Sequence, residues 1–435
     1  MDTPTLVPAD VAFMLVATAL VLLMTPALAF FYGGLVRSKN ALNTMMMSFV
    51  ALGFVGVAWA LAGYSLAFAG TGAAVGDLSK AFLAGVGLEP QGTIPQLLFM
   101  AYQGTFAIIT AALISGAIVE RMRFLAYLVF ITLWSLVVYA PIAHWVWGGG
   151  FLAKMGALDF AGGTVVHVNA ATAALVAALV LGQRKDYARQ AILPHNVPFV
   201  LLGAGLLWFG WFGFNAGSAL AANGIASLAF VNTMLAPAGT LVVWTLVDLA
   251  RSRKATAVGA ATGIVVGLVA ITPAAGFVSP LGALALGAFA ALPSYLALVL
   301  RARTGLDDSL DVVAAHGVGG TVGALLTGVL ASKAWNGTAD GLLYGNPAQL
   351  GVQALGVLAA IAYSAVASYL LLKLVGLVTP LKAATREEGL GLDVSQHGEE
   401  AYADDEGAIL ILQRPDNARE SAPALAAAAV EGGRS

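Results

Sequence analysis

Two histidines lie inside long apolar segments of the sequence, where an ionisable side chain is unusual. Valines flank His167, while alanines and glycines flank His316. An ionisable group inside a membrane span costs about 2.5–3.5 kcal/mol on insertion scales, so by default it marks a substrate path or a proton relay. Because an imidazole can both donate and accept hydrogen bonds, the pair could carry a proton. The alternative is that each ring makes an ordinary hydrogen bond between helices.

The remaining histidines and two acids favour structural roles. We expect His144, His195 and His397 at helix ends or on the surface. Asp159 and Asp311 stand close to the starts of the two histidine segments. A carboxylate at such a place can cap free backbone N–H groups and gains from the helix dipole. We therefore expect both to be structural, and Asp159 could also draw a cation toward the histidines.

Several aromatic residues and one serine could bind a cation: Phe106, Trp147, Phe214 and Ser218. An aromatic face attracts a cation by about 0.5–2 kcal/mol, and a serine hydroxyl can accept a hydrogen bond from it. The alternative is the belt that aromatic side chains form at membrane interfaces. Composition does not decide between the two for these four residues. The belt is favoured for three other residues: Trp145, Trp208 and Trp211.

The elements that must position these side chains are apolar helices. The chain has 435 residues, of which 59% are hydrophobic and 10% charged, less than half of the charge usual in soluble proteins. A membrane span needs roughly 20 mostly apolar residues, and about eleven segments qualify. They run from Asp10 to Val36, Ala41 to Phe68, Ile94 to Val119, Phe124 to Ala143, Gly162 to Gly182, Val197 to Asn215, Ile225 to Leu249, Val258 to Ala274, Pro280 to Leu300, Leu310 to Leu330 and Gln349 to Val378.

The distribution of Lys and Arg predicts the orientation, because loops rich in these residues stay in the cytoplasm. Every second loop is basic, starting with the loop that holds Arg37 and Lys39, whereas the alternate loops hold only Lys80, Lys154 and Lys333. We therefore expect the N-terminus outside and the C-terminus inside. If the first ten spans form two five-span repeats, His167 and His316 occupy corresponding positions, as in transporters built from inverted repeats.

Other features narrow the function. A net charge of -2 gives no basic bias toward nucleic acid, and the absence of cysteine excludes thiolate metal sites. No secretory signal peptide is visible. Residues 379–435 form a predicted cytoplasmic tail, expected to be disordered after about residue 405. This tail is too short for a catalytic domain of typical size.

The sequence resembles the ammonium transporter (Amt/Mep/Rh) family, and its bacterial Amt branch in particular. The resemblance covers about residues 9 to 402. The matching strings are Phe30–Arg37, Gly63–Phe68, Gly116–Phe124, Ala157–His167, Gly210–Ser218, Ala315–Gly317, Gly391–Asp393 and His397–Glu399.

The resemblance implies an all-α integral membrane homotrimer with one narrow pore in each eleven-helix subunit, residues 9–378. It implies a recruitment site made by Trp147, Ser218 and Phe106, and a phenyl gate made by Phe106 and Phe214. His167 and His316 match the paired pore histidines, and Asp159 matches a structural acid. The family often has Phe in the outer vestibule where this chain has Tyr102.

We therefore expect an ammonium transporter in the cell's inner (plasma) membrane that deprotonates ammonium and passes ammonia, with the proton relayed separately. No cofactor or metal is expected, and the partners implied are ammonium or ammonia, the lipid bilayer and a cytoplasmic PII-type signal protein. Two alternatives stay open. One is an ammonium sensor that signals through its tail, and the other is a membrane enzyme that uses the two histidines.

Overall fold

The computed structural model describes residues 5–402, and almost all of their regular structure is helical. The first half contains α1 (Pro8–Leu35), η1 (Ser38–Asn40), α2 (Ala41–Ala58), η2 (Trp59–Gly63), α3 (Tyr64–Phe68), η3 (Ala81–Leu83), β1 (Pro90–Gln91), β2 (Ile94–Pro95), α4 (Gln96–Leu113), η4 (Ile114–Ala117), α5 (Phe124–Trp134), η5 (Ser135–Tyr139), α6 (Ala140–Val146), α7 (Phe151–Lys154), η6 (Gly163–Val168) and α8 (Asn169–Leu181). The second half contains α9 (Val197–Ala216), η7 (Gly217–Ala219), α10 (Gly224–Ser252), α11 (Ala257–Ile271), α12 (Pro280–Arg301), η8 (Val313–Val318), α13 (Gly319–Leu330), α14 (Lys333–Asn336), η9 (Leu342–Tyr344), α15 (Pro347–Val378), α16 (Thr385–Leu390) and α17 (Leu392–His397).

The predicted apolar segments all fall on helices. Within the described residues, ten helical segments are long and apolar enough to cross a membrane, and α11 is a shorter apolar helix. The prediction of about eleven apolar helices is therefore confirmed. The predicted segment 258–274 extends past the end of α11. That helix ends earlier because the carbonyl groups of Thr272 and Pro273 accept hydrogen bonds from Ala161 and Phe160.

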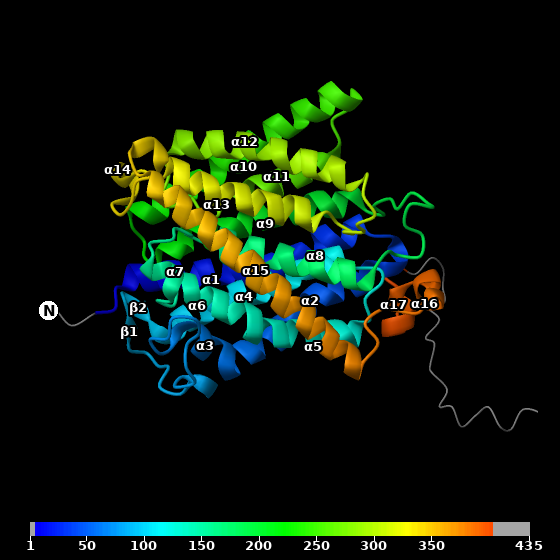
Figure 1. Ribbon diagram of the computed structural model, residues 1–435, viewed down its shortest axis with the longest axis horizontal. Helices are drawn as coiled ribbons and strands as arrows, with labels where there is room; N and C mark the ends of the chain where they lie inside the picture. The colour runs from blue at the N-terminus through cyan, green and yellow to red at the C-terminus, as the bar shows by residue number, and fades with distance from the viewer. Residues whose placement is uncertain (1–4, 403–435) are drawn as a thin grey trace, which may run out of the picture.

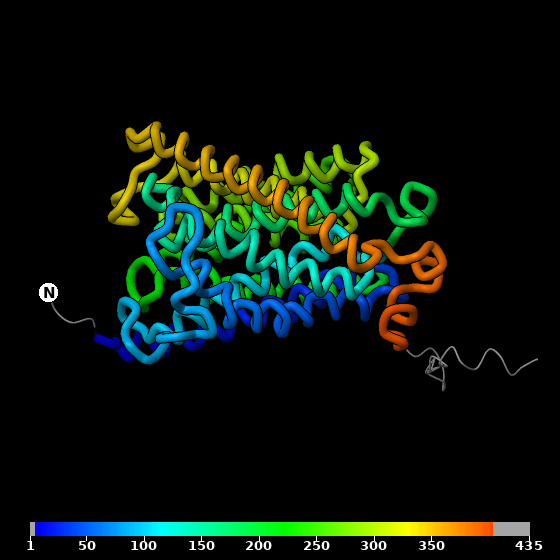
Figure 2. Tube along the Cα trace, turned by 60° about the horizontal axis from the view of Figure 1, so that its bottom comes forward, coloured from blue at the N-terminus to red at the C-terminus, as the bar shows by residue number. Residues whose placement is uncertain are grey.

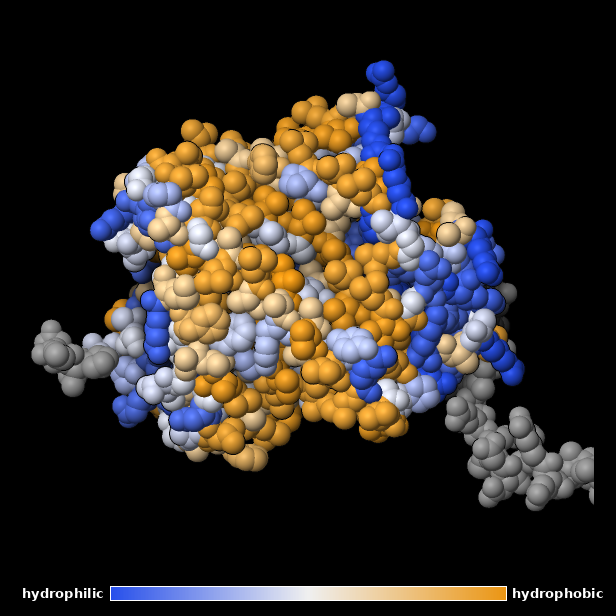
Figure 3. All heavy atoms as spheres, in the orientation of Figure 1, coloured by the Kyte–Doolittle hydropathy of each residue, from blue (hydrophilic) through white to orange (hydrophobic). Residues whose placement is uncertain are grey.

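The long helices run side by side, so the molecule has two opposite ends (Figures 1 and 2). We call the end that holds the start of α1 and the strands β1 and β2 the N face. The opposite end holds α16 and α17, and we call it the tail face. Orange apolar side chains cover the middle of the surface in Figure 3, while blue hydrophilic ones gather at the tail face. This pattern fits helices whose middles contact lipid.

Ion pairs hold the loops together at the tail face. Arg184 contacts Glu120 at 2.9 Å and Asp307 at 2.7 Å, and Arg37 contacts Glu120 at 3.0 Å. Burial opposes the charge of Glu120, but Arg184 and Arg37 together outweigh it and lower the pKa of that carboxyl. These contacts join loops that follow α1, η4, α8 and α12, so the tail ends of four helices are fixed together.

The tail packs onto this end of the molecule. Asp393 at the start of α17 accepts hydrogen bonds from the backbone N–H groups of Leu42 and Asn43, at 3.0 and 2.7 Å. Glu388 in α16 accepts one from Lys185 N–H at 2.7 Å. The predicted disorder after about residue 405 lies outside the described residues.

Candidate functional site

Three cavities follow one another between the two faces. The N-face cavity has a volume of about 300 Å³ and is lined by Phe106 among others. A central cavity of about 10 Å³ lies between Phe214 and the two histidines. A tail-face cavity of about 320 Å³ shares His316 and Phe31 with the central one. Because a single water needs roughly 10–15 Å³ of such space, the central cavity has room for about one molecule of that size.

The two histidines predicted from the sequence meet in the central cavity. His167 and His316 are 1% and 3% exposed, and their Nδ1 atoms lie 3.2 Å apart. Since both nitrogens face each other at hydrogen-bond distance, one Nδ1 must donate and the other accept. Among the described residues, Nε2 of His167 has no hydrogen-bond partner. The pair therefore keeps one buried nitrogen free to bind a small molecule in the cavity.

Both histidines lie in short π-helical stretches at the beginning of a longer helix. His167 is in η6, which runs into α8, and His316 is in η8, which runs into α13. A π-helical turn widens the helix and is frequent at functional sites. Each histidine also follows an aspartate by eight residues, His167 after Asp159 and His316 after Asp308.

Asp159 caps η6, as we expected. Its Oδ1 accepts hydrogen bonds from the N–H groups of Gly162 and Gly163, and its Oδ2 from those of Thr164 and Val165. The four distances are between 2.6 and 3.0 Å. Burial raises the pKa of Asp159, while these hydrogen bonds act in the opposite direction. The carboxylate thus fixes the segment that carries one of the paired histidines.

The expectation that Asp311 caps the other segment is wrong. Asp308 does so, because its carboxylate oxygens accept from the N–H groups of Val312 and Val313 at 3.1 and 2.8 Å. Asp311 has a φ of 59°, and its carboxylate instead contacts Arg301 Nε at 2.5 Å. Burial, reinforced by the charge of Asp311, raises the pKa of Asp308 to about 6. The eight-residue spacing shared with Asp159 is the sequence signal that identifies the capping residue.

The aromatic residues separate the N-face cavity from the central one. The rings of Phe106 and Phe214 stack with centroids 4.1 Å apart. Phe106 lines the N-face cavity and Phe214 the central cavity. Trp147 and Ser218 also line the N-face cavity, and the Trp147 ring stands perpendicular to that of Phe106 at 5.9 Å. The structure therefore brings these four sequence-predicted residues together at one cavity and its inner wall.

Tyr102 departs from the expectation. It is fully buried behind the wall of the N-face cavity, and its hydroxyl lies 3.0 and 2.9 Å from the carbonyl oxygens of Gly213 and Phe214. It also lies 3.3 Å from Ser218 Oγ. Its position supports the end of α9, which carries Phe214, rather than the cavity itself.

The assignment of Trp211 and Trp145 to an interfacial belt is wrong, because they are 2% and 7% exposed. The Trp211 ring stacks at 5.5 Å on the ring of His167, and its Nε1 donates to Thr272 Oγ1 at 2.9 Å. Trp211 therefore shapes the central cavity, where sequence reasoning missed it. Trp208 is partly exposed and donates to the carbonyl of Thr233 at 3.0 Å.

The three other histidines bind backbone or tail groups. The ring nitrogens of His144 lie 3.0 and 2.7 Å from the carbonyl oxygens of Ala67 and Gly72. His195 and His397 lie at the tail face, where they contact Tyr402 and Asn43 at 2.9 Å each. None of the three lines the central cavity.

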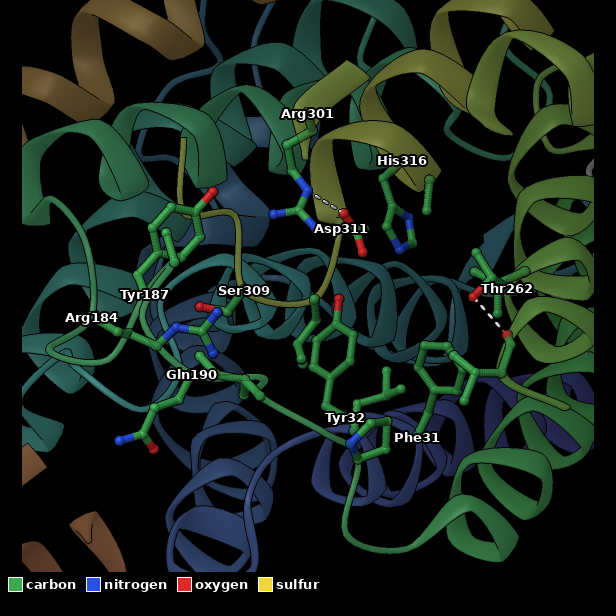
Figure 4. Close-up of a pocket in the computed structure, with 18 residues that line it drawn as sticks. Phe31, Tyr32, Arg184, Tyr187, Gln190, Thr262, Arg301, Ser309, Asp311 and His316 are labelled. Carbon is green, nitrogen blue, oxygen red and sulfur yellow. Dashed lines mark hydrogen bonds and ion pairs between the residues drawn. The ribbon is translucent and has the colours of Figure 1, made fainter. Parts of the chain in front are cut away.

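Figure 4 shows the tail-face cavity, which His316 enters together with the Arg301–Asp311 pair, opposite Phe31 and Tyr32. In the part of the chain between residues 5 and 402, no group of three or more His, Asp or Glu side chains could hold a metal ion. The site consists instead of a row of three cavities, with the smallest at the histidines and the stacked Phe106–Phe214 pair between it and the N-face cavity.

Comparison with known proteins agrees with this arrangement. The model of the Ammonium Transporter Family matches residues 12–402. An ammonium transporter of Bacillus subtilis is 48% identical over 400 residues, which cover 91% of this chain and 98% of that protein. Saccharomyces cerevisiae Mep2 has a similar solved structure, with a TM-score of 0.81 and 37% identity over 87% of this chain and 91% of Mep2. A structure described as a sensor Amt protein has a TM-score of 0.83 and 30% identity over 89% of this chain and 98% of that one. This multi-pass membrane chain, with paired histidines in a small cavity between two larger ones, belongs to the ammonium transporter family.

Proposed function

We propose that the chain recruits ammonium in the N-face cavity, removes one proton and passes neutral ammonia between the paired histidines to the tail-face cavity. The observation that carries the proposal is the central cavity of about 10 Å³. Both imidazoles and the indole of Trp211 line it, and its other lining side chains are apolar. It lies between two cavities that are about thirty times larger.

Recruitment depends on rings and on hydrogen-bond acceptors. Trp147 donates its Nε1–H to the carbonyl of Asp159 at 2.8 Å, which fixes the orientation of its ring beside Phe106. Ser218 Oγ already donates to the carbonyl of Phe214 at 2.9 Å, so its lone pairs are left to accept from a cation. Aromatic faces add about 0.5–2 kcal/mol of attraction. The N-face cavity is therefore suited to a small cation that carries its own N–H donors.

The central cavity penalises a cation. A charge in an apolar membrane interior costs about 2.5 to 17 kcal/mol, depending on the scale used, and a space for one small molecule admits no hydration shell. Ammonium can avoid this cost by leaving a proton behind, whereas potassium carries no proton to lose. The Phe106–Phe214 pair, stacked at 4.1 Å, lies where the ion has to lose its water.

The histidines supply a route for the proton. With one N–H shared between the two Nδ1 atoms, one Nε2 carries hydrogen and the other carries a lone pair. When the Nε2 lone pair takes up a proton, the shared proton moves across the 3.2 Å contact and the other ring releases its Nε2 proton, so that the two rings exchange these roles. A proton accepted at one ring can thus be released from the other, which makes uptake electrogenic when ammonia and the proton both cross.

The orientation and assembly are also part of the proposal. We place the N face outside the cell and the tail face in the cytoplasm, which agrees with the arginine-rich loops at the tail face. The matched Asp159–His167 and Asp308–His316 spacings support two inverted repeats, with α15 as the final span. We further propose a homotrimer with one passage in each subunit, and a PII-type partner at the tail face.

A sensor remains the second candidate, because one similar structure is described as a sensor Amt protein. Reconstitution separates the two. Proteoliposomes that contain only the purified chain are exposed to an ammonium gradient while the current is recorded. A transporter gives a saturable ammonium current without any partner. A pure sensor gives the same signal as liposomes without protein, and that result would refute the proposal.

A further inference from the structure

One polar side chain in the N-face cavity has no function in the scheme above. Gln103 lies on α4 and lines this cavity together with Phe106, Trp147 and Ser218. It is only 9% exposed. Its Oε1 atom is buried and has no hydrogen-bond partner within residues 5–402.

An unpartnered buried amide is unfavourable for folding. Most buried polar side-chain atoms in proteins are hydrogen-bonded, and an exception needs an explanation. Apart from Gln103, Ser218 and the indole N–H of Trp147, the side chains around this cavity are hydrocarbon: Phe68, Phe99, Phe106, Val146, Phe160 and Leu220. The amide therefore lies among rings that attract cations and beside a single hydroxyl.

The chemistry of this set selects its ligand. Ammonium has four N–H donors and no acceptor, so leaving water requires acceptors in the site. A glutamine amide oxygen accepts two hydrogen bonds. No charged side chain lines the cavity, so a neutral acceptor can hold the ion without trapping it there. An acidic residue would add an attraction that opposes the next step.

We propose that the amide oxygen of Gln103 accepts a hydrogen bond from the recruited ammonium ion, as a second acceptor beside Ser218 Oγ. This inference rests on the proposed function and adds a specificity residue to the recruitment site. The amide bonds to no other side chain in the described part of the chain. It can therefore turn toward the cation without breaking a protein contact.

The size of the effect follows from the acceptor that is lost. Hydrogen bonds to charged groups are the stronger ones in proteins. Removing one should raise the ammonium concentration that gives half-maximal current by about 10- to 150-fold. The maximal current should change less than twofold, because the central cavity and its histidines are untouched.

The test compares Gln103→Leu with wild type in proteoliposomes, by recording current against ammonium concentration. Leucine has a similar size and no acceptor. Gln103→Glu keeps the acceptor and should hold the half-maximal concentration at or below that of wild type. Gln96→Leu is the matched control, since it removes a glutamine from the same helix, two turns closer to the N face and outside the cavity lining.

A thermal unfolding measurement separates this role from a structural one. If Gln103 serves the substrate, Gln103→Leu removes an unpartnered polar group and unfolds at the same temperature as wild type or higher. If wild type conducts normally and Gln103→Leu has an unchanged half-maximal concentration, the inference about Gln103 is overturned, while the proposed function still stands. A lower unfolding temperature with an unchanged half-maximal concentration also overturns it. If wild type gives no ammonium current, the proposed function itself fails.

Discussion

Replacing Asp159 by Asn should release half of the cap that holds the segment of His167. In the wild type, Oδ1 serves Gly162 and Gly163, and Oδ2 serves Thr164 and Val165. Asparagine keeps one of these oxygens and replaces the other by an NH₂ group, which cannot accept. Two backbone N–H groups therefore lose their partner inside a buried site.

The magnitude follows from the cost of an unsatisfied buried donor, which is about 1–3 kcal/mol. Two such donors destabilise the segment by about 2–6 kcal/mol in total. For each amide, the same cost corresponds to hydrogen exchange that is faster by about 5- to 150-fold. In Asp159→Asn, exchange should become faster for only one of the two amide pairs, either Gly162 and Gly163 or Thr164 and Val165. In Asp159→Ala, exchange should become faster for both pairs.

Hydrogen exchange measured by mass spectrometry over residues 162–168 provides the assay. Asp308→Asn is the matched control, because it removes part of the cap on η8 and should leave exchange in η6 unchanged. In Asp159→Asn the ammonium current should fall together with the protection of these amides from exchange. The reason is that Trp147 donates a hydrogen bond to the backbone carbonyl of the same residue, whose position depends on the cap. Equal exchange in Asp159→Asn and wild type would refute the reasoning.

Two further changes test the gate and the tail. Phe214→Ala removes one ring of the stacked pair, so liposomes should show faster osmotic water flow. They should show no potassium current, since the central cavity of about 10 Å³ still has no room for a hydrated ion. Unchanged water flow would argue against a gate at this pair. Burial raises the pKa of Asp393 to about 6. The carboxyl of Asp393 therefore binds a proton more readily in the docked tail than in a free tail. Docking of the tail should weaken as the pH rises from about 4 through 6, because Asp393 then loses this proton. A spin label at Glu399→Cys, placed in a chain without other cysteines, should become more mobile over that pH range. Adding Asp393→Asn should abolish this pH dependence. A label mobility that does not change with pH while Asp393 is present would contradict the prediction.

Much of the fold could be predicted from the sequence because apolar length and charge set the helices directly. The segment predicted from Ala41 to Phe68 coincides with the run of α2, η2 and α3. The end of α11 could not be placed, since it depends on contacts between Thr272 and Pro273 and a loop far away in the chain. Hydropathy carries no signal for such a contact.

At the candidate site, too, some residues could be predicted from the sequence and others depend on contacts that the sequence does not reveal. His167 and His316 were both conspicuous in the sequence, because a buried ionisable group is costly, and the resemblance to the family implied that they pair. Trp211 was assigned to a belt because a tryptophan near a span end looks the same in sequence whether its ring faces lipid or a histidine. Gln103 was missed because its missing partner is visible only in three dimensions.

Asp308 could have been found from the sequence. The spacing of Asp159 from His167 recurs between Asp308 and His316. Proximity to the start of the span pointed instead to Asp311, whose carboxylate is held by Arg301.

The central claim is that nitrogen crosses the histidine cavity only after its ion has lost a proton. Potassium tests this most directly, because it resembles ammonium in size and charge but has no proton to give up. Currents are recorded from the same wild-type proteoliposomes, first with an ammonium gradient and then with an equal potassium gradient. We expect a saturable ammonium current and a potassium signal equal to that of protein-free liposomes. A potassium current comparable to the ammonium current would contradict the account.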